Sequence, residues 1–161
     1  MKMKKLIIIL VFILISVIAL NNIIALIVFS SDEAVIEFKP VLAYSAEVEL
    51  RYIHSVAKTP VFEYFSINED SFLLKKTVFE SFGAGLPLDG GEFKRENGKF
   101  VREGQNTRLD NLVIRVSRTK GQEIVIAGEI FDLQDLLEPG ERLIIDVFSP
   151  INYFRYRFKN K

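Results

Sequence analysis

The residue types best suited to chemistry gather in the stretch RYIHSVAKTP, residues 51–60, which contains the only histidine of the chain. A histidine side chain can exchange a proton near neutral pH, bind a metal ion or hold a ligand by hydrogen bonds. Apolar and polar side chains alternate through this region, which predicts a strand with His54 on the apolar face of Leu50 and Tyr52. Arg51 then points to the opposite face. We therefore expect His54 to point inward at one end of a sheet.

A glutamate in the following segment is the expected partner of this histidine. The segment PVFEYFSI, residues 60–67, is predicted to form the next strand of a hairpin. Glu63 lies between Val61 and Phe65 on the apolar face of that strand. We expect His54 and Glu63 to meet inside one end of the domain, where the carboxylate favours a charged imidazole and burial opposes it.

Three interpretations of His54 follow from this placement: a hydrogen-bonded plug of the domain end, a ligand contact, and a catalytic group. A triad needs a serine within reach of the histidine, and Ser55 is predicted to point to the other face. Nothing resembles a G-x-S-x-G nucleophile motif, and no metal-ligand spacing is recognisable. The sequence therefore favours a protein that is not an enzyme, with no catalytic residues, no metal site and no cofactor.

A glycine-rich segment, FESFGAGLPLDGG at residues 79–91, is the second candidate for a functional site. One interpretation is a loop whose glycines adopt positive φ angles. The other is a concave run of backbone N–H groups that receives an anion. Together with the histidine and nearby cations, it predicts a site for a small anionic solute, formed by Arg51, His54, Lys58, Glu63, Gly83 and Gly85.

The segment that precedes the strands is strongly apolar from Leu6 to Phe29. Its 24 residues form a helix of about 36 Å, enough to cross a hydrocarbon core of about 30 Å. Three lysines precede the run and two acidic residues follow it, which places the rest of the chain outside the cytoplasm. We predict a single-pass anchor in the cell membrane within residues 1–31, contacting lipid through residues 6–29, and one extracytoplasmic domain at residues 32–161. A cleaved signal peptide is the alternative.

Most of the domain reads as short alternating strands separated by glycine and proline. This pattern predicts a mainly β fold, a small antiparallel barrel or sandwich preceded by one transmembrane helix. Asn97-Gly98 predicts a hairpin turn, and only residues 132–140 are expected to be helical. The segment INYFRYRF, residues 151–158, is predicted to be a strand with a solvated basic face, or alternatively a contact with lipid head groups. That face contains Arg155, Arg157 and Lys159.

Composition narrows the classes of partner. Residues 32–161 contain 18 basic and 21 acidic side chains, a formal charge of −3, which argues against binding nucleic acid. The chain has no cysteine, so disulfides and thiolate chemistry are excluded.

The motif R-Y-x-H-S-V, followed by T-P-V-x-E and S-F-G-A-G-L-P, resembles the uncharacterised domain-of-unknown-function family 1850 over residues 36–117. Members are small prokaryotic proteins with an N-terminal hydrophobic segment, and their genes often lie beside TRAP-type carboxylate transporters of the TAXI class. The resemblance implies a membrane-anchored accessory or ligand-binding module associated with such a transporter. It implies no catalytic residues. The alternatives are a structural interaction domain without a ligand and a hydrolase that uses His54.

Overall fold

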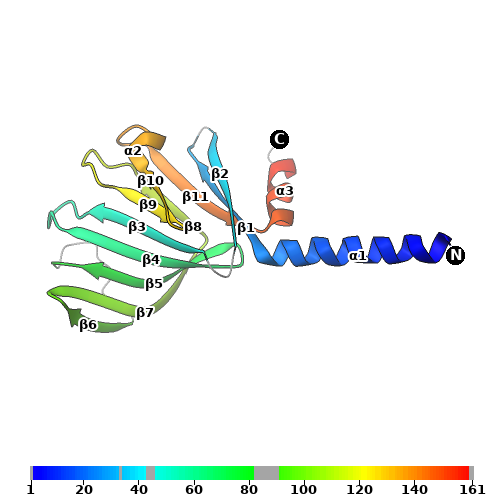
Figure 1. The fold of residues 1–161 in the computed structure, drawn as a ribbon. Coiled ribbons are helices and arrows are strands. Elements are labelled where there is room, and N and C mark those ends of the chain that lie inside the picture. The colour runs from blue at the N-terminus through cyan, green and yellow to red at the C-terminus, as the bar shows by residue number, and fades with distance from the viewer. Residues whose placement is uncertain (1, 33, 43–45, 82–90, 160–161) are drawn as a thin grey trace.

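The computed structural model describes residues 2–32, 34–42, 46–81 and 91–159, and it consists of a long helix followed by two antiparallel sheets (Figure 1). Within these residues the smaller sheet has four strands in the order β2-β1-β11-β8: β1 Ile24–Ser30, β2 Val35–Leu42, β8 Asn111–Arg115 and β11 Arg142–Phe148. Over the same described residues the larger sheet has seven strands in the order β10-β9-β3-β4-β5-β7-β6: β3 Glu47–Ile53, β4 Pro60–Asn68, β5 Ser71–Phe79, β6 Glu92–Glu96, β7 Lys99–Leu109, β9 Glu123–Ile126 and β10 Glu129–Asp132. The helices are α1 Lys2–Ile23, α2 Leu133–Leu136 and α3 Pro150–Lys159.

The two sheets form the layers of a sandwich and do not close into a barrel. Alternate residues of the central strands point between the layers, as the period of two requires, whereas all five residues of the edge strand β6 are exposed. The side chains of the main core that are fully inaccessible to solvent come from both sheets and from α2: Ile27, Phe29, Val48, Phe72, Ile124, Ile126, Leu133, Leu143 and Ile145. The predicted mainly β sandwich is therefore confirmed.

The apolar run Leu6–Phe29 does not form one continuous helix, contrary to the expectation from sequence. Helix α1 ends at Ile23, and the next seven residues form β1 in the smaller sheet, between β2 and β11. Asn21 and Asn22 mark the change, and the β-branched residues after them suit a strand. The β-sandwich therefore begins at Ile24, before the boundary at residues 31 and 32 that the sequence predicts.

The segment after Ser149 is a helix and not the predicted strand. Pro150 occupies the first helical position, where its fixed φ and missing N–H are tolerated. The carbonyl of Ser149 accepts the N–H of Tyr153 at 2.9 Å, and Asp70 Oδ1 accepts the N–H of Ser149 at 2.5 Å. Alternation of rings and cations is typical of a strand. Pro150 at the first helical position and the contact with Asp70 instead favour a helix.

The predicted hairpin turn is confirmed, and within the predicted helical segment 132–140 the helix covers only Leu133–Leu136. Asn97 and Gly98 have φ angles of 50° and 81° and form the tight turn between β6 and β7. Asp132 caps the short helix α2, and its Oδ1 accepts the N–H of Gln134 at 2.9 Å.

Candidate functional site

The larger sheet has a second, smaller cluster of buried side chains at the end that carries the β3–β4 loop, which we call the loop end. Val61 and Phe79 are its buried centre, with Tyr52 and Phe100 packed against them. The rings of Phe79, Phe93 and Phe100 lie 5.6–5.8 Å apart between centroids. In Figure 1 this end lies on the side of the sandwich away from α1.

A row of polar side chains crosses this apolar surface. Glu63 on β4 is directly opposite Thr77 on β5, and Thr77 is directly opposite Arg102 on β7. Because opposite residues of an antiparallel pair share a face, all three side chains point to the face of Val61 and Phe79. Thr77 and Arg102 are each only 2% exposed. Burying polar groups is costly unless they are bonded, so such a row is unusual in a sandwich interior.

Tyr52 and Glu63 form a pair within this group. The Tyr52 hydroxyl donates to Glu63 Oε1 at 3.3 Å. Burial raises the pKa of the Glu63 carboxyl, and the hydrogen bond from Tyr52 opposes that shift. Burial and the Glu63 charge both raise the pKa of Tyr52. The phenol therefore stays protonated as a donor, and the carboxyl takes up a proton more readily than an exposed glutamate.

His54 holds the β3–β4 loop together. Its side chain is 6% exposed, and Nδ1 accepts the N–H groups of Val56 at 3.2 Å and Ala57 at 3.1 Å. Its backbone N–H donates to the Thr59 carbonyl, and its carbonyl accepts the N–H of Lys58, each at 2.9 Å. An Nδ1 atom that accepts two N–H groups carries no proton. This geometry supports the interpretation of His54 as a hydrogen-bonded plug.

Neither Glu63 nor Arg51, two of the residues predicted to share a site with His54, lies beside the histidine. Glu63 is paired with Tyr52, and the strand register places it opposite Leu50 and not beside His54. Arg51 points to the outer face of the sheet, as its alternation predicts. There its guanidinium contacts Glu49 Oε1 at 2.9 Å.

The other residues of the predicted anionic site are the cation Lys58 and the loop glycines. Lys58 is exposed in the β3–β4 loop with a φ of 57°. Arg51 also contacts Glu123 at 3.5 Å, and the hydrogen bond that it donates to Glu49 is the main reason why the pKa of Arg51 is raised. Arg51 is therefore neutralised on the outer face and does not border the inner row. Gly83 and Gly85 lie outside the described residues.

The structure does join the two sequence motifs at the loop end. The hydroxyl oxygens of Thr59 and Ser81 are 2.9 Å apart and share a hydrogen bond between the β3–β4 loop and the residues after β5. Sequence reasoning missed Thr77 and Arg102. The signal for Arg102 is its place two residues after Phe100 in KFVREG, on the same face as that ring.

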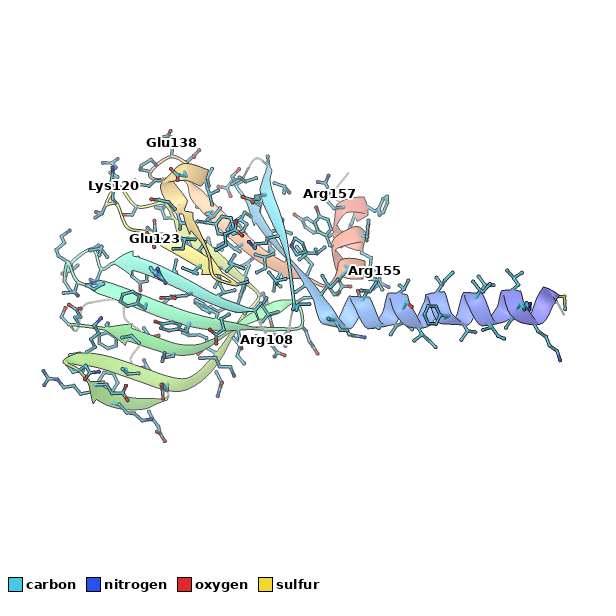
Figure 2. All side chains as sticks on the ribbon, in the orientation of Figure 1. Arg108, Lys120, Glu123, Glu138, Arg155 and Arg157 are labelled. Atoms are coloured by element: carbon cyan, nitrogen blue, oxygen red, sulfur yellow. The ribbon has the colours of Figure 1, made fainter. Side chains whose placement is uncertain are left out.

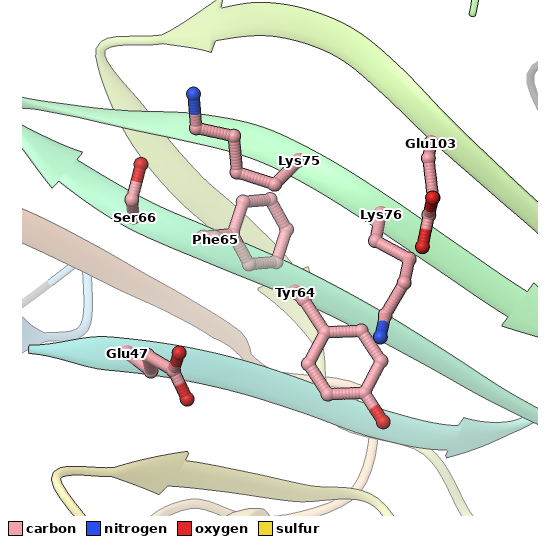
Figure 3. A pocket seen from close by; sticks show the side chains of 7 residues that line it. All are labelled: Glu47, Tyr64, Phe65, Ser66, Lys75, Lys76 and Glu103. Atoms are coloured by element: carbon pink, nitrogen blue, oxygen red, sulfur yellow. The ribbon is translucent and has the colours of Figure 1, made fainter. Parts of the chain in front are cut away.

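A hollow of about 390 Å³ lies on the outer face of the larger sheet, beside bulges in the pairing of β4 with β5 and of β5 with β7 (Figure 3). It is lined by Glu47, Tyr64, Phe65, Ser66, Lys75, Lys76 and Glu103. Its cations have partners: the Lys76 ammonium lies 4.5 Å from the Tyr64 ring centroid, and Lys75 donates to Asn106 at 2.9 Å.

No metal centre is found within the part of the chain that the structure describes. There, no three His, Cys, Asp or Glu side chains converge in a way that could hold a metal ion.

Comparison with known proteins matches the part of the chain that forms the larger sheet and β8 of the smaller sheet. A family model described as "Domain of unknown function (DUF1850)" matches residues 48–133, more than half of the chain, and the chain belongs to this family. No curated protein and no solved structure matches it. The match begins in β3 and ends at the start of α2, so it includes the polar row and excludes α1, β1, β2, β11 and α3.

Proposed function

We propose that this member of the DUF1850 family is a membrane-anchored, extracytoplasmic binding module that takes a small carboxylate at the loop end of its larger sheet. The single observation that carries the proposal is the inward-facing row Glu63, Thr77 and Arg102 beside the cluster of phenylalanine rings. A guanidinium and a hydroxyl recognise the oxygens of a carboxylate, and the rings suit its hydrocarbon part.

Anchoring is supported by helix α1. Among the described residues one stretch, Met3–Ile23, is long and apolar enough to cross a membrane, and no residue of its most apolar window is buried. The three lysines before it favour a cytoplasmic N-terminus and a sandwich on the other side. Because β1 starts at Ile24 and is buried between its neighbours, processing by a signal peptidase is compatible with the fold only before that residue.

The proposed partner is a TRAP-type transporter for carboxylates, as the family resemblance implies. A carboxylate site on an anchored module would present solute near such a transporter. Crosslinking of the full-length protein in native membranes, followed by identification of the linked chains, tests this step. Recovery of transporter subunits supports the partnership, and their absence from the linked chains contradicts it without bearing on the carboxylate site.

The site is tested by thermal unfolding of the full-length protein in detergent with succinate or propionate, and with succinamide as the uncharged analogue. A ligand at a hundred times its Kd stabilises the folded state by about 2.7 kcal/mol, which raises Tm by roughly 8 °C for a protein of this size. We expect the carboxylates to raise Tm and succinamide to leave it unchanged.

Matched variants locate the effect. Arg102→Lys keeps the charge but loses the guanidinium fork, and Thr77→Val keeps the shape but loses the hydroxyl, so both should reduce the carboxylate-dependent rise in Tm. Arg51→Lys makes the same replacement on the outer face and should keep the rise in full. A wild-type protein that no carboxylate stabilises would contradict the proposal and favour a structural interaction domain. An equal rise in Arg102→Lys and Arg51→Lys would move the site elsewhere.

A further inference from the structure

The C-terminal helix α3 is fixed at the point where α1 enters the sandwich. The Ile151 N–H donates to Asn21 Oδ1 of α1 at 2.9 Å, and α1 and α3 are in contact. Asp70, in the β4–β5 turn, accepts from both Ser149 and Asn152 at the start of α3. In Figure 1, α3 runs across the direction of α1, on the side of the sandwich from which α1 leaves.

Helix α3 has two different faces. Successive residues of a helix are about 100° apart, so Ile151, Phe154 and Phe158 share one side. These side chains are 39%, 61% and 76% exposed. On the other side, the rings of Tyr153 and Tyr156 lie 6.1 and 5.1 Å from the Phe148 ring. The polar-ended rings therefore pack on the sandwich, and the apolar side chains face outward.

The charges of α3 have a single sign. Its ten residues include no acidic side chain, and Arg155, Arg157 and Lys159 are all exposed. Arg155 and Arg157 lie on either side of the apolar stripe by helical geometry, and both are labelled on α3 in Figure 2. Lysine and arginine beside an apolar stripe can keep their charged ends among phosphate groups while the stripe enters the lipid.

The position of α3 along α1 matches the depth of a membrane surface. The 21-residue stretch Met3–Ile23 is about 31 Å long, close to the thickness of a hydrocarbon core. Asn21, which holds the start of α3, lies two residues before the end of that stretch. If α1 spans the bilayer, the exposed face of α3 is at the level of the head groups.

We propose that α3 is an interfacial helix that lies on the outer surface of the membrane and binds anionic phospholipid. Ile151, Phe154 and Phe158 insert at the boundary of head groups and acyl chains, and the three cations contact phosphate. This inference rests on the membrane anchoring proposed above. Attachment through two helices fixes the sandwich relative to the membrane, with its loop end directed away from the lipid.

Single cysteines test this arrangement, because the natural chain has none. The full-length protein is reconstituted in phosphatidylcholine vesicles with or without phosphatidylglycerol, and a nitroxide is attached at Phe154→Cys or Phe158→Cys. Val56→Cys, 70% exposed in the β3–β4 loop, is the control for a site in water, and Leu14→Cys in α1 is the control for the bilayer core. Accessibility to oxygen, which dissolves in lipid, is compared with accessibility to a water-soluble nickel chelate.

We expect the labels on α3 to lose nickel accessibility relative to the label at residue 56 and to gain oxygen accessibility. A core-like signal from residue 14 combined with water-like signals from residues 154 and 158 would overturn the interfacial helix and leave the anchor in place. A water-like signal from residue 14 would overturn both proposals. Replacing Arg155, Arg157 and Lys159 together by Gln should abolish the added protection that phosphatidylglycerol provides; unchanged protection would overturn the role of the cations.

Discussion

At the loop end of the larger sheet, polar side chains are buried beside phenylalanine rings. At the opposite end, where α1 leaves the sandwich, apolar side chains are exposed, and we call this the anchor end. Arg102 is 2% exposed at the loop end, and Phe158 is 76% exposed at the anchor end. In a soluble domain that folds by burial alone, each placement raises the free energy. The loop end therefore buries polar side chains, the anchor end exposes apolar ones, and the two placements have different explanations.

The family match separates the two ends as well. The polar row lies within residues 48–133, while α1, β1 and α3 lie outside them. The loop end thus belongs to the part of the chain that defines the family. The anchor end is built from segments on either side of that part, which meet through the hydrogen bond between Asn21 and Ile151. We interpret the loop end as the site of recognition and the anchor end as the attachment to lipid.

The largest expected effect concerns where the anchor ends and the sandwich begins. Ile27, Val28 and Phe29 of β1 are at most 1% exposed, and burying three such side chains contributes about 6 kcal/mol, comparable to the whole stability of a small domain. A chain that starts at residue 32 should therefore not unfold cooperatively. A chain that starts at residue 24 lacks only α1 and should give a β-type circular dichroism spectrum and a sharp melting transition. Equal melting of the two chains would show that β1 is dispensable.

The second effect tests the plug interpretation of His54. Replacement by Ala removes the acceptor of two N–H groups in a partly exposed loop, which we expect to lower the free energy of unfolding by about 1–3 kcal/mol. His54→Asn offers an oxygen near the position of Nδ1 and should recover part of the loss. Urea denaturation of the two variants measures both. A His54→Ala protein as stable as the wild type, with weaker carboxylate binding, would instead make His54 a ligand contact.

Sequence patterns predicted the parts of this fold whose local and long-range preferences agree. Alternation placed Leu50 and Glu63 on the inner face and Arg51 on the outer face, and Asn97-Gly98 and Asp132 marked a turn and a helix start. These features depend on neighbours in the chain, so they can be read from spacing.

The remaining features depend on contacts distant in sequence. The apolar run from Leu6 is long enough to be one helix, and only pairing with β2 and β11 makes its last part a strand. The segment after Ser149 alternates like a strand, but Asp70, 79 residues earlier, holds its first turn. The sequence did not predict that Arg102 is buried, because the polar row is assembled from three strands. In the sequence of β7 alone, little distinguishes a buried arginine from an exposed one.

A smaller effect distinguishes the buried carboxyl from those on the outer face. Because burial raises the pKa of Glu63, the folded state binds its proton more tightly than the unfolded state does. The stability gained from this tighter proton binding is complete below the ordinary glutamate pKa of about 4.3. It is lost as the pH rises through the pKa of Glu63 in the folded state. Glu63→Gln removes the ionisation, so the variant should be more stable than the wild type at pH 7, with an advantage that shrinks toward pH 4.

The pH dependence is measured by urea denaturation across this interval. Glu49→Gln is the matched control on the outer face, where the carboxylate contacts Arg51, and it should bring no gain at pH 7. A wild-type protein whose stability rises with pH through this interval, relative to Glu63→Gln, would show that the folded state favours the charged carboxylate. In that case a cation of the row, and not burial, would dominate at the loop end.

The smallest expected effect on stability belongs to the exposed rings of the anchor end. Phe154 and Phe158 are outside the core, so Phe154→Ser with Phe158→Ser in the chain that starts at residue 24 should change the free energy of unfolding by less than about 0.5 kcal/mol. Phe79→Ser at the loop end, where the ring is 2% exposed, should cost several kcal/mol by the same measurement, in line with about 3–5 kcal/mol for truncating a buried ring.

The double variant should also sediment less with vesicles that contain phosphatidylglycerol, because the apolar stripe of α3 is then polar. A large loss of stability in the double variant would mean that these rings support the sandwich and are not held at the surface for the membrane.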